Sequence, residues 1–246
     1  MIRLERVITA NDINIDTNFE QGSIYTIIGK NGSGKSTILK TILGLKEVKA
    51  GQVLFNNNPL NDINLKLRGC NCSYVPQSFN LSFDLKVKDV INMGANLGWN
   101  VFTNNYETEV NAMKLKKIVS ELKINTLMDK YYYSLSGGEQ TLVSVARALM
   151  QDSKFVLFDE ADSSLDITYK NLYYDIVTSL CTKYGKGVIL VTHNLNFVLN
   201  NEVTVIALDG KSTRVLPANK IDQIFLSKVF DTNIEIIEYN KKKLIL

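Results

Sequence analysis

The sequence predicts an α/β fold in which a mostly parallel sheet carries helices on both faces. Apolar runs of strand length recur along the chain, among them Ile24–Ile28, Phe155–Phe158 and Val188–Val191. Segments with helical periodicity separate these runs, as between residues 172 and 180. Strands that are apolar on both faces and alternate with helices are typical of a parallel sheet buried between two helical layers.

Length and composition fit a globular protein and exclude several kinds of function. A chain of 246 residues forms one large or two small domains, and its shares of 45% hydrophobic and 22% charged residues are ordinary. The 28 basic residues exceed the 25 acidic ones by only 3, so the charge predicts no nucleic-acid partner. The basic run Lys241–Lys243 is interpreted as a solvated tail. Three cysteines and one histidine exclude a disulfide framework and a histidine-rich metal site.

The sequence contains no feature of export or membrane insertion. Its first residues include no apolar segment of the kind that forms a signal peptide. No apolar run approaches the roughly 18 residues that a membrane-spanning helix needs. We therefore expect a soluble chain in the cytosol.

The predicted elements divide the chain into a core and an insertion. Strand Ile24–Ile28 is followed by a glycine-rich turn and by a helix whose apolar residues stop at Gly44. The strands before residue 24 alternate in polarity and predict an antiparallel layer. Helical periodicity then dominates the middle of the chain. We expect an α/β core from residues 1–77 and 147–215, an inserted helical subdomain over 78–146, and a C-terminal helix and strand over 216–246.

The glycine-rich turn has the clearest chemistry. Residues 29–37 match the pattern G-x-x-x-x-G-K-[ST] between a predicted strand and a predicted helix. Glycines let the backbone curl so that its N–H groups face phosphate oxygens, and the following helix presents its positive end to the same anion. Lys35 would contact the β- and γ-phosphates, and Ser36 would supply a hydroxyl ligand to Mg²⁺. The predicted nucleotide-binding residues are Gly29, Lys30, Asn31, Gly32, Ser33, Gly34, Lys35, Ser36 and Thr37.

Two adjacent carboxylates follow the apolar strand Phe155–Phe158 at its carboxyl end. Ligands bind at this end of the strands in open α/β sheets. Asp159 is therefore predicted to hold Mg²⁺. Glu160 is predicted to act as general base on the attacking water, a role worth roughly 10²–10⁴-fold in rate. The alternative, in which the two acids only begin a loop, carries less weight beside the phosphate loop.

A third motif, Leu135-Ser136-Gly137-Gly138-Glu139-Gln140, precedes a predicted helix. Together with the phosphate loop and Asp159-Glu160, it resembles the signature of ATP-binding-cassette (ABC) ATPases. Further segments follow in that family's order: Gln77 resembles the Q-loop, Ser163-Ser164-Leu165-Asp166 the D-loop, and His193 the switch histidine. The resemblance covers nearly the whole chain. It implies a P-loop fold of the ABC type, with ATP as nucleotide and Mg²⁺ as cofactor.

The resemblance also implies a role for each motif. The signature residues Leu135, Ser136, Gly137, Gly138 and Glu139 would face the γ-phosphate held by a partner's phosphate loop, so that a head-to-tail homodimer encloses two ATP molecules. Gln77 would bind Mg²⁺ or the attacking water, and His193 would touch the γ-phosphate. The implied D-loop is Ser164, Leu165 and Asp166. The implied catalytic residues are Glu160, His193, Gln77 and Lys35, and the implied metal ligands are Ser36, Gln77 and Asp159.

The chain departs from the family's pattern in two places. ABC ATPases usually place an aromatic residue some twenty positions before the phosphate loop, where it stacks on adenine, but Arg6–Ala10 contains none. Base stacking contributes ~1–3 kcal/mol, so ATP affinity and base selectivity both depend on what replaces it. After Glu160, Ala161-Asp162 stands where the family commonly has Pro-Thr, which adds a carboxylate near the γ-phosphate.

Within the family, the chain most resembles the separate ATPase subunit of an importer, because it has a single cassette and no long heptad arms. Leu165-Asp166-Ile167, His193–Asn196 and Lys228–Phe230 resemble the iron–siderophore, haem and cobalamin branch, and also the zinc and manganese branch. The implied partners are integral-membrane permease subunits and, indirectly, a substrate-binding protein, at the cytoplasmic face of the inner membrane. The alternative is a soluble ABC ATPase that acts as an assembly or regulatory factor.

The stretch Gly94–Asn105 is a candidate for permease docking. It carries Trp99 and Phe102 among asparagine and glycine residues. Aromatic side chains on a polar loop suit an interface hot spot, but they fit equally well folded back into the helical insertion.

Overall fold

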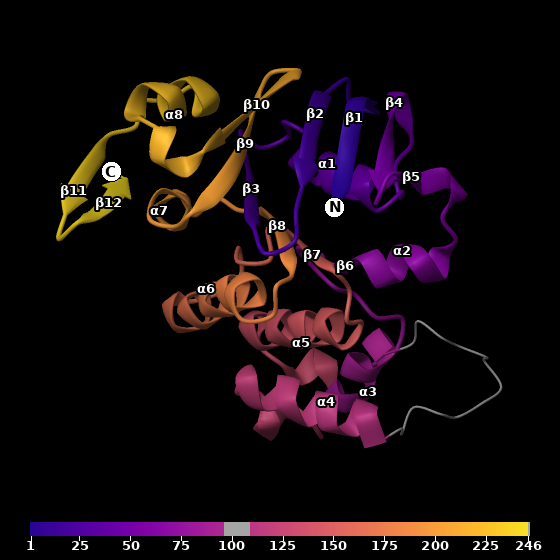
Figure 1. Cartoon of the computed structure of the whole chain (residues 1–246). Helices are drawn as coiled ribbons and strands as arrows, with labels where there is room; N and C mark the ends of the chain where they lie inside the picture. Colours follow the sequence, from indigo (N-terminus) through magenta and orange to yellow (C-terminus); the bar gives the residue numbers. More distant parts are fainter. Residues whose placement is uncertain (96–108, 246) are drawn as a thin grey trace. The chain divides into compact units, whose positions relative to one another are not determined.

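The computed structural model describes residues 1–95 and 109–245. The contacts of the chain form two compact units, which are described separately. Unit 1 comprises Met1–Ile63 and Leu180–Leu246, and unit 2 comprises Asn64–Ser179. Figure 1 shows the elements of both units.

Unit 1 is built on a mixed sheet whose strands lie in the order β5-β4-β1-β2-β10-β9-β3-β8. The N-terminal part is antiparallel: β1 (Ile2–Thr9) pairs with β2 (Asn14–Phe19) and β4 (Val48–Phe55). The central strand β3 (Ile24–Ile28) pairs in parallel with β8 (Gly187–Val191) and β9 (Val203–Asp209). Every residue of β3 and β8 is buried, as their continuous apolar sequences predict. The predicted parallel core and antiparallel N-terminal layer are therefore confirmed.

The remaining elements of unit 1 flank this sheet. The strands β5 (Asn58–Pro59) and β10 (Ser212–Pro217) complete it. The helical segments are α1 (Lys35–Ile42), η1 (Leu60–Asp62), α7 (Leu195–Leu199), η5 (Ala218–Lys220) and α8 (Gln223–Phe230).

The C-terminal hairpin corrects one interpretation of the sequence. Strands β11 (Ile236–Tyr239) and β12 (Lys242–Ile245) pair in antiparallel fashion. The Asn200 side chain donates to the carbonyl of Lys243 and accepts from its N–H, at 2.7 and 2.8 Å. The run Lys241–Lys243 is therefore part of a paired hairpin rather than a solvated tail, because its backbone finds partners although its first two side chains are exposed.

Unit 2 is mainly helical. Its helices are α2 (Leu65–Asn71), α3 (Val87–Asn92), α4 (Glu109–Glu121), α5 (Gly137–Met150) and all but the last turn of α6 (Ile167–Thr182), and its 3₁₀ segments are η2 (Met93–Ala95), η3 (Asn125–Leu127) and η4 (Tyr132–Ser134). Helix α5 contacts α3, α4 and η2. A Cβ atom on Gly94 would lie 1.9 Å from the carbonyl oxygen of Arg147, so only glycine lets η2 come so close to α5. In the ranges that the structure covers, no helix combines the length and apolarity required to cross a bilayer.

Two parallel strands accompany the helices of unit 2. Strand β6 (Cys72–Val75) pairs with β7 (Phe155–Asp159) in a register that sets Tyr74 opposite Leu157 and Val75 opposite Phe158. Helix α5 also packs on β6. The carboxyl ends of β6 and β7 therefore lie side by side, and each leads into a segment that the sequence analysis singled out.

Candidate nucleotide-binding site

The phosphate loop of residues 29–37 joins β3 to α1 in unit 1. Gly32 and Gly34 have φ angles of 77° and 97°, a region that favours glycine. The Lys35 ammonium donates to the carbonyl oxygens of Gly29 and Lys30, each at 3.0 Å, and Lys35 is only 4% exposed. The loop is therefore wrapped around a buried positive charge at the start of a helix.

The hydroxyl of Ser33 is a further feature of the loop that fits a phosphate. Its oxygen is buried and has no hydrogen-bond partner among the described residues. Leaving a buried hydroxyl unsatisfied costs about 1–3 kcal/mol. Together with the lysine and the N-terminus of α1, this hydroxyl makes the loop suited to an anion with several oxygen acceptors.

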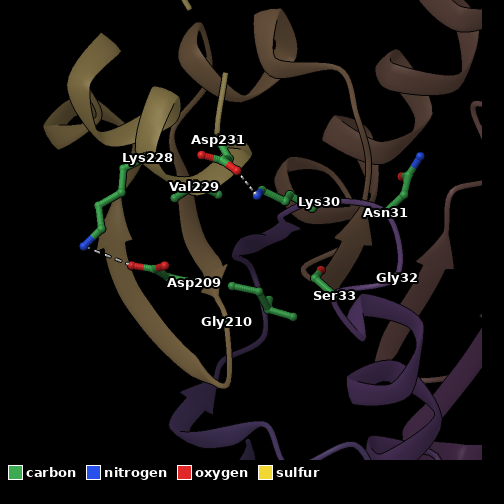
Figure 2. Close-up of a pocket in the computed structure, with 10 residues that line it drawn as sticks. Lys30, Asn31, Gly32, Ser33, Asp209, Gly210, Lys228, Val229 and Asp231 are labelled. Carbon is green, nitrogen blue, oxygen red and sulfur yellow. Dashed lines mark hydrogen bonds and ion pairs between the residues drawn. The ribbon is translucent and has the colours of Figure 1, made fainter. Parts of the chain in front are cut away.

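A pocket of about 550 Å³ lies beside the phosphate loop in unit 1 (Figure 2). Two ion pairs link its walls: Lys30 with Asp231 at 2.8 Å, and Lys228 with Asp209 at 3.2 Å. The hydrogen bond from Lys30 lowers the pKa of the Asp231 carboxyl. Asp231, the residue after α8, is thus paired with Lys30, the second residue of the phosphate loop.

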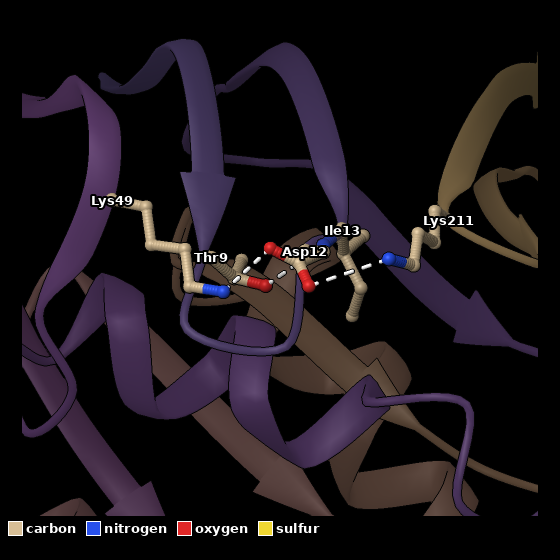
Figure 3. Close-up of polar contacts among 5 residues, drawn as sticks. All are labelled: Thr9, Asp12, Ile13, Lys49 and Lys211. Atoms are coloured by element: carbon tan, nitrogen blue, oxygen red, sulfur yellow. Dashed lines mark hydrogen bonds and ion pairs between the residues drawn. The ribbon is translucent and has the colours of Figure 1, made fainter.

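The turn between β1 and β2 lies on another flank of the phosphate loop. The Asn11 amide donates to the Thr37 hydroxyl at 3.2 Å, and a Cβ on Gly34 would lie 2.2 Å from Cδ1 of the buried Ile13. Asp12 accepts from Lys49 at 2.5 Å and from Lys211 at 3.3 Å (Figure 3), and the bond from Lys49 is the main cause of its lowered pKa. In this turn, the side chains that contact the loop are thus the amide of Asn11 and the aliphatic chain of Ile13.

His193 lies at the same edge of the unit 1 sheet as the phosphate loop. Ile27 of β3 pairs with Val191 of β8, and His193 and Gly29 each follow two residues later. The His193 side chain is exposed, while the preceding Thr192 is buried and its hydroxyl accepts from the N–H of Asn194 at 2.9 Å. Asn194 in turn caps α7. His193 thus follows the carboxyl end of β8, at the same end of the strands as the phosphate loop.

The predicted carboxylates lie at the carboxyl end of β7 in unit 2, where Asp159 is the last residue of the strand and Glu160 follows it. Asp159 is 4% exposed and accepts a hydrogen bond from the Tyr74 hydroxyl at 2.8 Å. The Gln77 amide donates to Glu160 Oε2 at 3.3 Å, and Glu160 has a φ angle of 50°. Burial, followed by the bond to Asp159, raises the pKa of Tyr74 well above its usual value, so the phenol remains a donor. The structure thus brings Gln77, Asp159 and Glu160 together.

The signature motif begins α5 in unit 2. The Ser136 hydroxyl accepts from the N–H of Glu139 at 3.3 Å, and Glu139 accepts from the N–H of Ser136 at 2.8 Å, which forms a capping box. A Cβ on Gly138 would lie 2.9 Å from the ring of Tyr169. The Ser136 hydroxyl only accepts in this capping box, so its own O–H and the backbone N–H groups of the two glycines are donors that this helix start offers to an anion.

The D-loop lies beside the signature motif. The Ser164 hydroxyl is 3.3 Å from the Thr141 hydroxyl on α5, and Asp166 accepts from the N–H of Tyr169 at the start of α6. Leu165 is buried. Asp162, expected to add a carboxylate near the γ-phosphate, is 6% exposed and accepts from the Tyr174 hydroxyl at 2.6 Å. The Asp162 carboxylate is therefore buried and hydrogen-bonded within unit 2.

The predicted site residues thus form groups in separate units. The phosphate loop and His193 belong to unit 1, whereas Gln77, Asp159, Glu160, the signature motif and the D-loop belong to unit 2. Trp99 and Phe102 lie outside the described residues.

Sequence reasoning missed two residues that support the unit 2 group. Tyr74 binds Asp159, and Arg147 donates to the Tyr74 carbonyl at 3.3 Å while its guanidinium lies 4.2 Å from the centre of the Phe79 ring. The only signal for either residue was its place within or after a motif.

A strand, a glycine-rich loop around a buried lysine, and a helix define a P-loop nucleotide-binding protein when the loop lies at the carboxyl end of parallel strands, as it does here. The family model described as ABC transporter matches residues 13–163. The chain therefore belongs to the ABC transporter family, in which it is an ATP-binding subunit and an ATPase.

Known relatives resemble the chain over most of its length. It is 31% identical to the zinc import ATP-binding protein ZnuC of Acinetobacter baylyi, over 85% of this chain and 74% of the relative. It is 28% identical to a probable iron chelatin transport ATP-binding protein of Helicobacter pylori, over 90% of this chain and 88% of the relative. A solved inward-facing transporter assigned to the metal-chelate type aligns with a TM-score of 0.82 and 22% identity, covering 99% of this chain and 95% of that one. That last likeness shows the fold.

Proposed function

We propose that this chain is the ATP-hydrolysing subunit of an ABC importer whose cargo is an iron–siderophore, haem or a related metal chelate. In this proposal, two copies form a head-to-tail dimer that drives a membrane permease from the cytoplasmic face of the inner membrane. A substrate-binding protein delivers the cargo to that permease. The observation that carries the hydrolytic part is the pair of β7 carboxylates, one buried against Tyr74 and the other held by Gln77.

The residues of the chain have distinct tasks in this reaction. Lys35 and the N–H groups of the loop bind the phosphates, and the positive end of α1 offsets their charge. Glu160 accepts the proton of the attacking water, and its contact with Gln77 involves only one of its two carboxylate oxygens. His193 contacts the γ-phosphate from the edge of β8. The N–H groups of Gly137 and Gly138 stabilise the γ-phosphate of the partner's ATP.

The oxygen atoms offered by three of the predicted site residues also suit Mg²⁺. Ser36, Gln77 and Asp159 would supply a hydroxyl, an amide oxygen and a carboxylate, which are the hard oxygen ligands that this ion prefers. When bound, Mg²⁺ neutralises charge on the β- and γ-phosphates. The buried carboxylate of Asp159 fits this role because it has a hydrogen-bond donor on one oxygen.

The cargo is proposed from the relatives. An iron chelatin relative matches 90% of this chain, and the metal-chelate transporter shares its fold. A zinc importer is the second candidate, favoured by the 31% identity to a zinc import ATP-binding protein. Because cargo specificity is determined by other subunits, the site of this chain is the same in both cases.

The test is to tag the chain in its native host, solubilise membranes in mild detergent, and identify co-purifying proteins by mass spectrometry. A permease with many spans at near-equal stoichiometry supports the importer, and the binding protein encoded or purified with it identifies the cargo. A Lys35→Ala chain is the matched control, because docking should not require nucleotide binding. Recovery only from the cytosol, alone or with soluble partners, would overturn the importer in favour of an assembly or regulatory ATPase.

A further inference from the structure

Residues in and just after β6 supply one hydrogen-bond donor to each of two adjacent carboxylates, the last residue of β7 and the residue that follows it. Tyr74 donates to Asp159 Oδ2 at 2.8 Å, and Gln77, three residues later, donates to Glu160 Oε2 at 3.3 Å. The parallel register sets Tyr74 opposite Leu157, two residues before Asp159. The phenol is therefore long enough to reach the carboxylate beyond the end of its own strand.

The Tyr74 bond restricts the geometry of Asp159. A carboxylate can present either oxygen to a cation, and its rotation about the terminal bond is otherwise broad. Asp159 is 4% exposed, so bulk water does not compete strongly for Oδ2. A donor on Oδ2 therefore restricts the plane in which the carboxylate lies.

The backbone around Tyr74 is itself fixed. Its carbonyl accepts from Arg147 Nη2 at 3.3 Å, and the same guanidinium lies 4.2 Å from the centre of the Phe79 ring. Arg147 belongs to α5, the helix that begins with the signature motif. Tyr74 is thus held by its pairing with β7 and by the contact of its carbonyl with α5, as a residue that orients another side chain must be.

We propose that Tyr74 is a positioning residue that orients the Asp159 carboxylate toward the divalent cation accompanying the nucleotide. The inference rests on the proposed function, in which Asp159 holds that cation. Partners that orient a ligating carboxylate typically change metal affinity or activity by about 10–100-fold when they are lost. The competing explanation is that Tyr74 only satisfies a buried carboxylate and contributes to folding.

The experiment compares the full chain with Tyr74→Phe, and measures the affinity for a non-hydrolysable ATP analogue in EDTA and in saturating Mg²⁺. The dissociation constant in EDTA is divided by that in Mg²⁺. By linkage, this ratio reports how much more tightly the metal binds the analogue on the protein than in solution. We expect unchanged affinity in EDTA, which also shows that the phosphate loop is folded, and a ratio that falls about tenfold. The spectrum of bound Mn²⁺ should change in the same variant, since an untethered carboxylate alters the ligand geometry.

The matched control is Tyr174→Phe, which removes the same kind of bond to a buried aspartate, Asp162, at 2.6 Å. We expect it to keep the wild-type ratio. A wild-type ratio and Mn²⁺ spectrum in Tyr74→Phe would overturn the inference, as would an equal fall in Tyr174→Phe.

An Asp159→Asn variant separates this outcome from failure of the proposed function. Loss of metal dependence in Asp159→Asn together with a wild-type ratio in Tyr74→Phe would overturn the role of Tyr74 alone. Full metal dependence in Asp159→Asn would overturn the metal role of Asp159, and the inference with it.

Discussion

The Lys35 ammonium lies 3.0 Å from two carbonyl oxygens of its own loop and is almost entirely buried. In Lys35→Ala, we expect ATP affinity to fall by about 10- to 150-fold, because a hydrogen bond to a charged group contributes about 1.5–3 kcal/mol. Isothermal titration with ATP measures this. Lys88→Ala, which removes an exposed lysine paired with Asp129 at 3.6 Å, is the control and should bind normally. Wild-type affinity in Lys35→Ala would contradict the assignment of the loop.

The three cysteines provide a test of burial by their reactivity. Burial raises the pKa of the Cys181 thiol to about 11 and raises that of Cys72 further, so both remain protonated at pH 8 and react slowly. Cys70 is exposed. We expect iodoacetamide at pH 8 to modify Cys70 alone in the folded chain and all three cysteines in denaturant, as read by mass spectrometry. Labelling of Cys72 in the native state would show that β6 is not packed as described.

At the scale of the element, we expect the turn between β1 and β2 to lie close to the base of a bound nucleotide, because it contacts the phosphate loop. Asn11 binds Thr37, the last residue of the phosphate loop, and no aromatic residue occurs from Arg6 to Ile13. In Asn11→Tyr, we expect ATP to bind at least about fivefold more tightly, since stacking a base on an aromatic ring contributes ~1–3 kcal/mol. The affinity for inorganic triphosphate, which has no base, should be unchanged and is the control. Equal affinity for ATP in both proteins would place the base elsewhere.

Elements buried on both faces were predictable from the sequence, and exposed ones were not. Ile24–Ile28 was predicted with its observed bounds because a continuous apolar run specifies a strand covered on both sides. A strand was expected in the C-terminal segment, but the pairing of β11 with β12 was not predicted, because both strands are short and largely exposed and no alternation of burial marks them. Helix α7 spans only Leu195–Leu199, which is too short to reveal a period of 3.6.

The candidate site was predictable only as far as its motifs are local. The phosphate loop, Asp159-Glu160 and the signature motif are each contiguous, so spacing alone locates them. The bond from Tyr74 to Asp159 joins residues 85 positions apart, and it depends on β6 lying beside β7 in one particular register. A single sequence holds no signal for that register, because a shift by one residue would direct Tyr74 to the other face of the strand pair.

For the whole molecule, the proposed head-to-tail dimer makes the oligomeric state depend on the chemistry of one side chain. Glu160→Gln keeps the size of the side chain but removes the general base, which should slow hydrolysis by roughly 10²–10⁴-fold. ATP then stays bound between two chains, where it links the phosphate loop of one copy to the signature motif of the other. We expect gel filtration in ATP and Mg²⁺ to give twice the mass of a single chain, and a single chain without nucleotide.

Two further variants show whether such a dimer forms through the bound nucleotide. Glu109→Gln removes an exposed acid on α4 and should hydrolyse ATP and elute as the wild type does. Adding Gly137→Asp to Glu160→Gln puts a carboxylate where the proposed dimer places the partner's γ-phosphate, and the like charges should keep the chains apart although each still binds ATP. Dimers that persist in the double variant would mean that the two chains associate through a different surface. Normal turnover in Glu160→Gln would mean that another group accepts the proton.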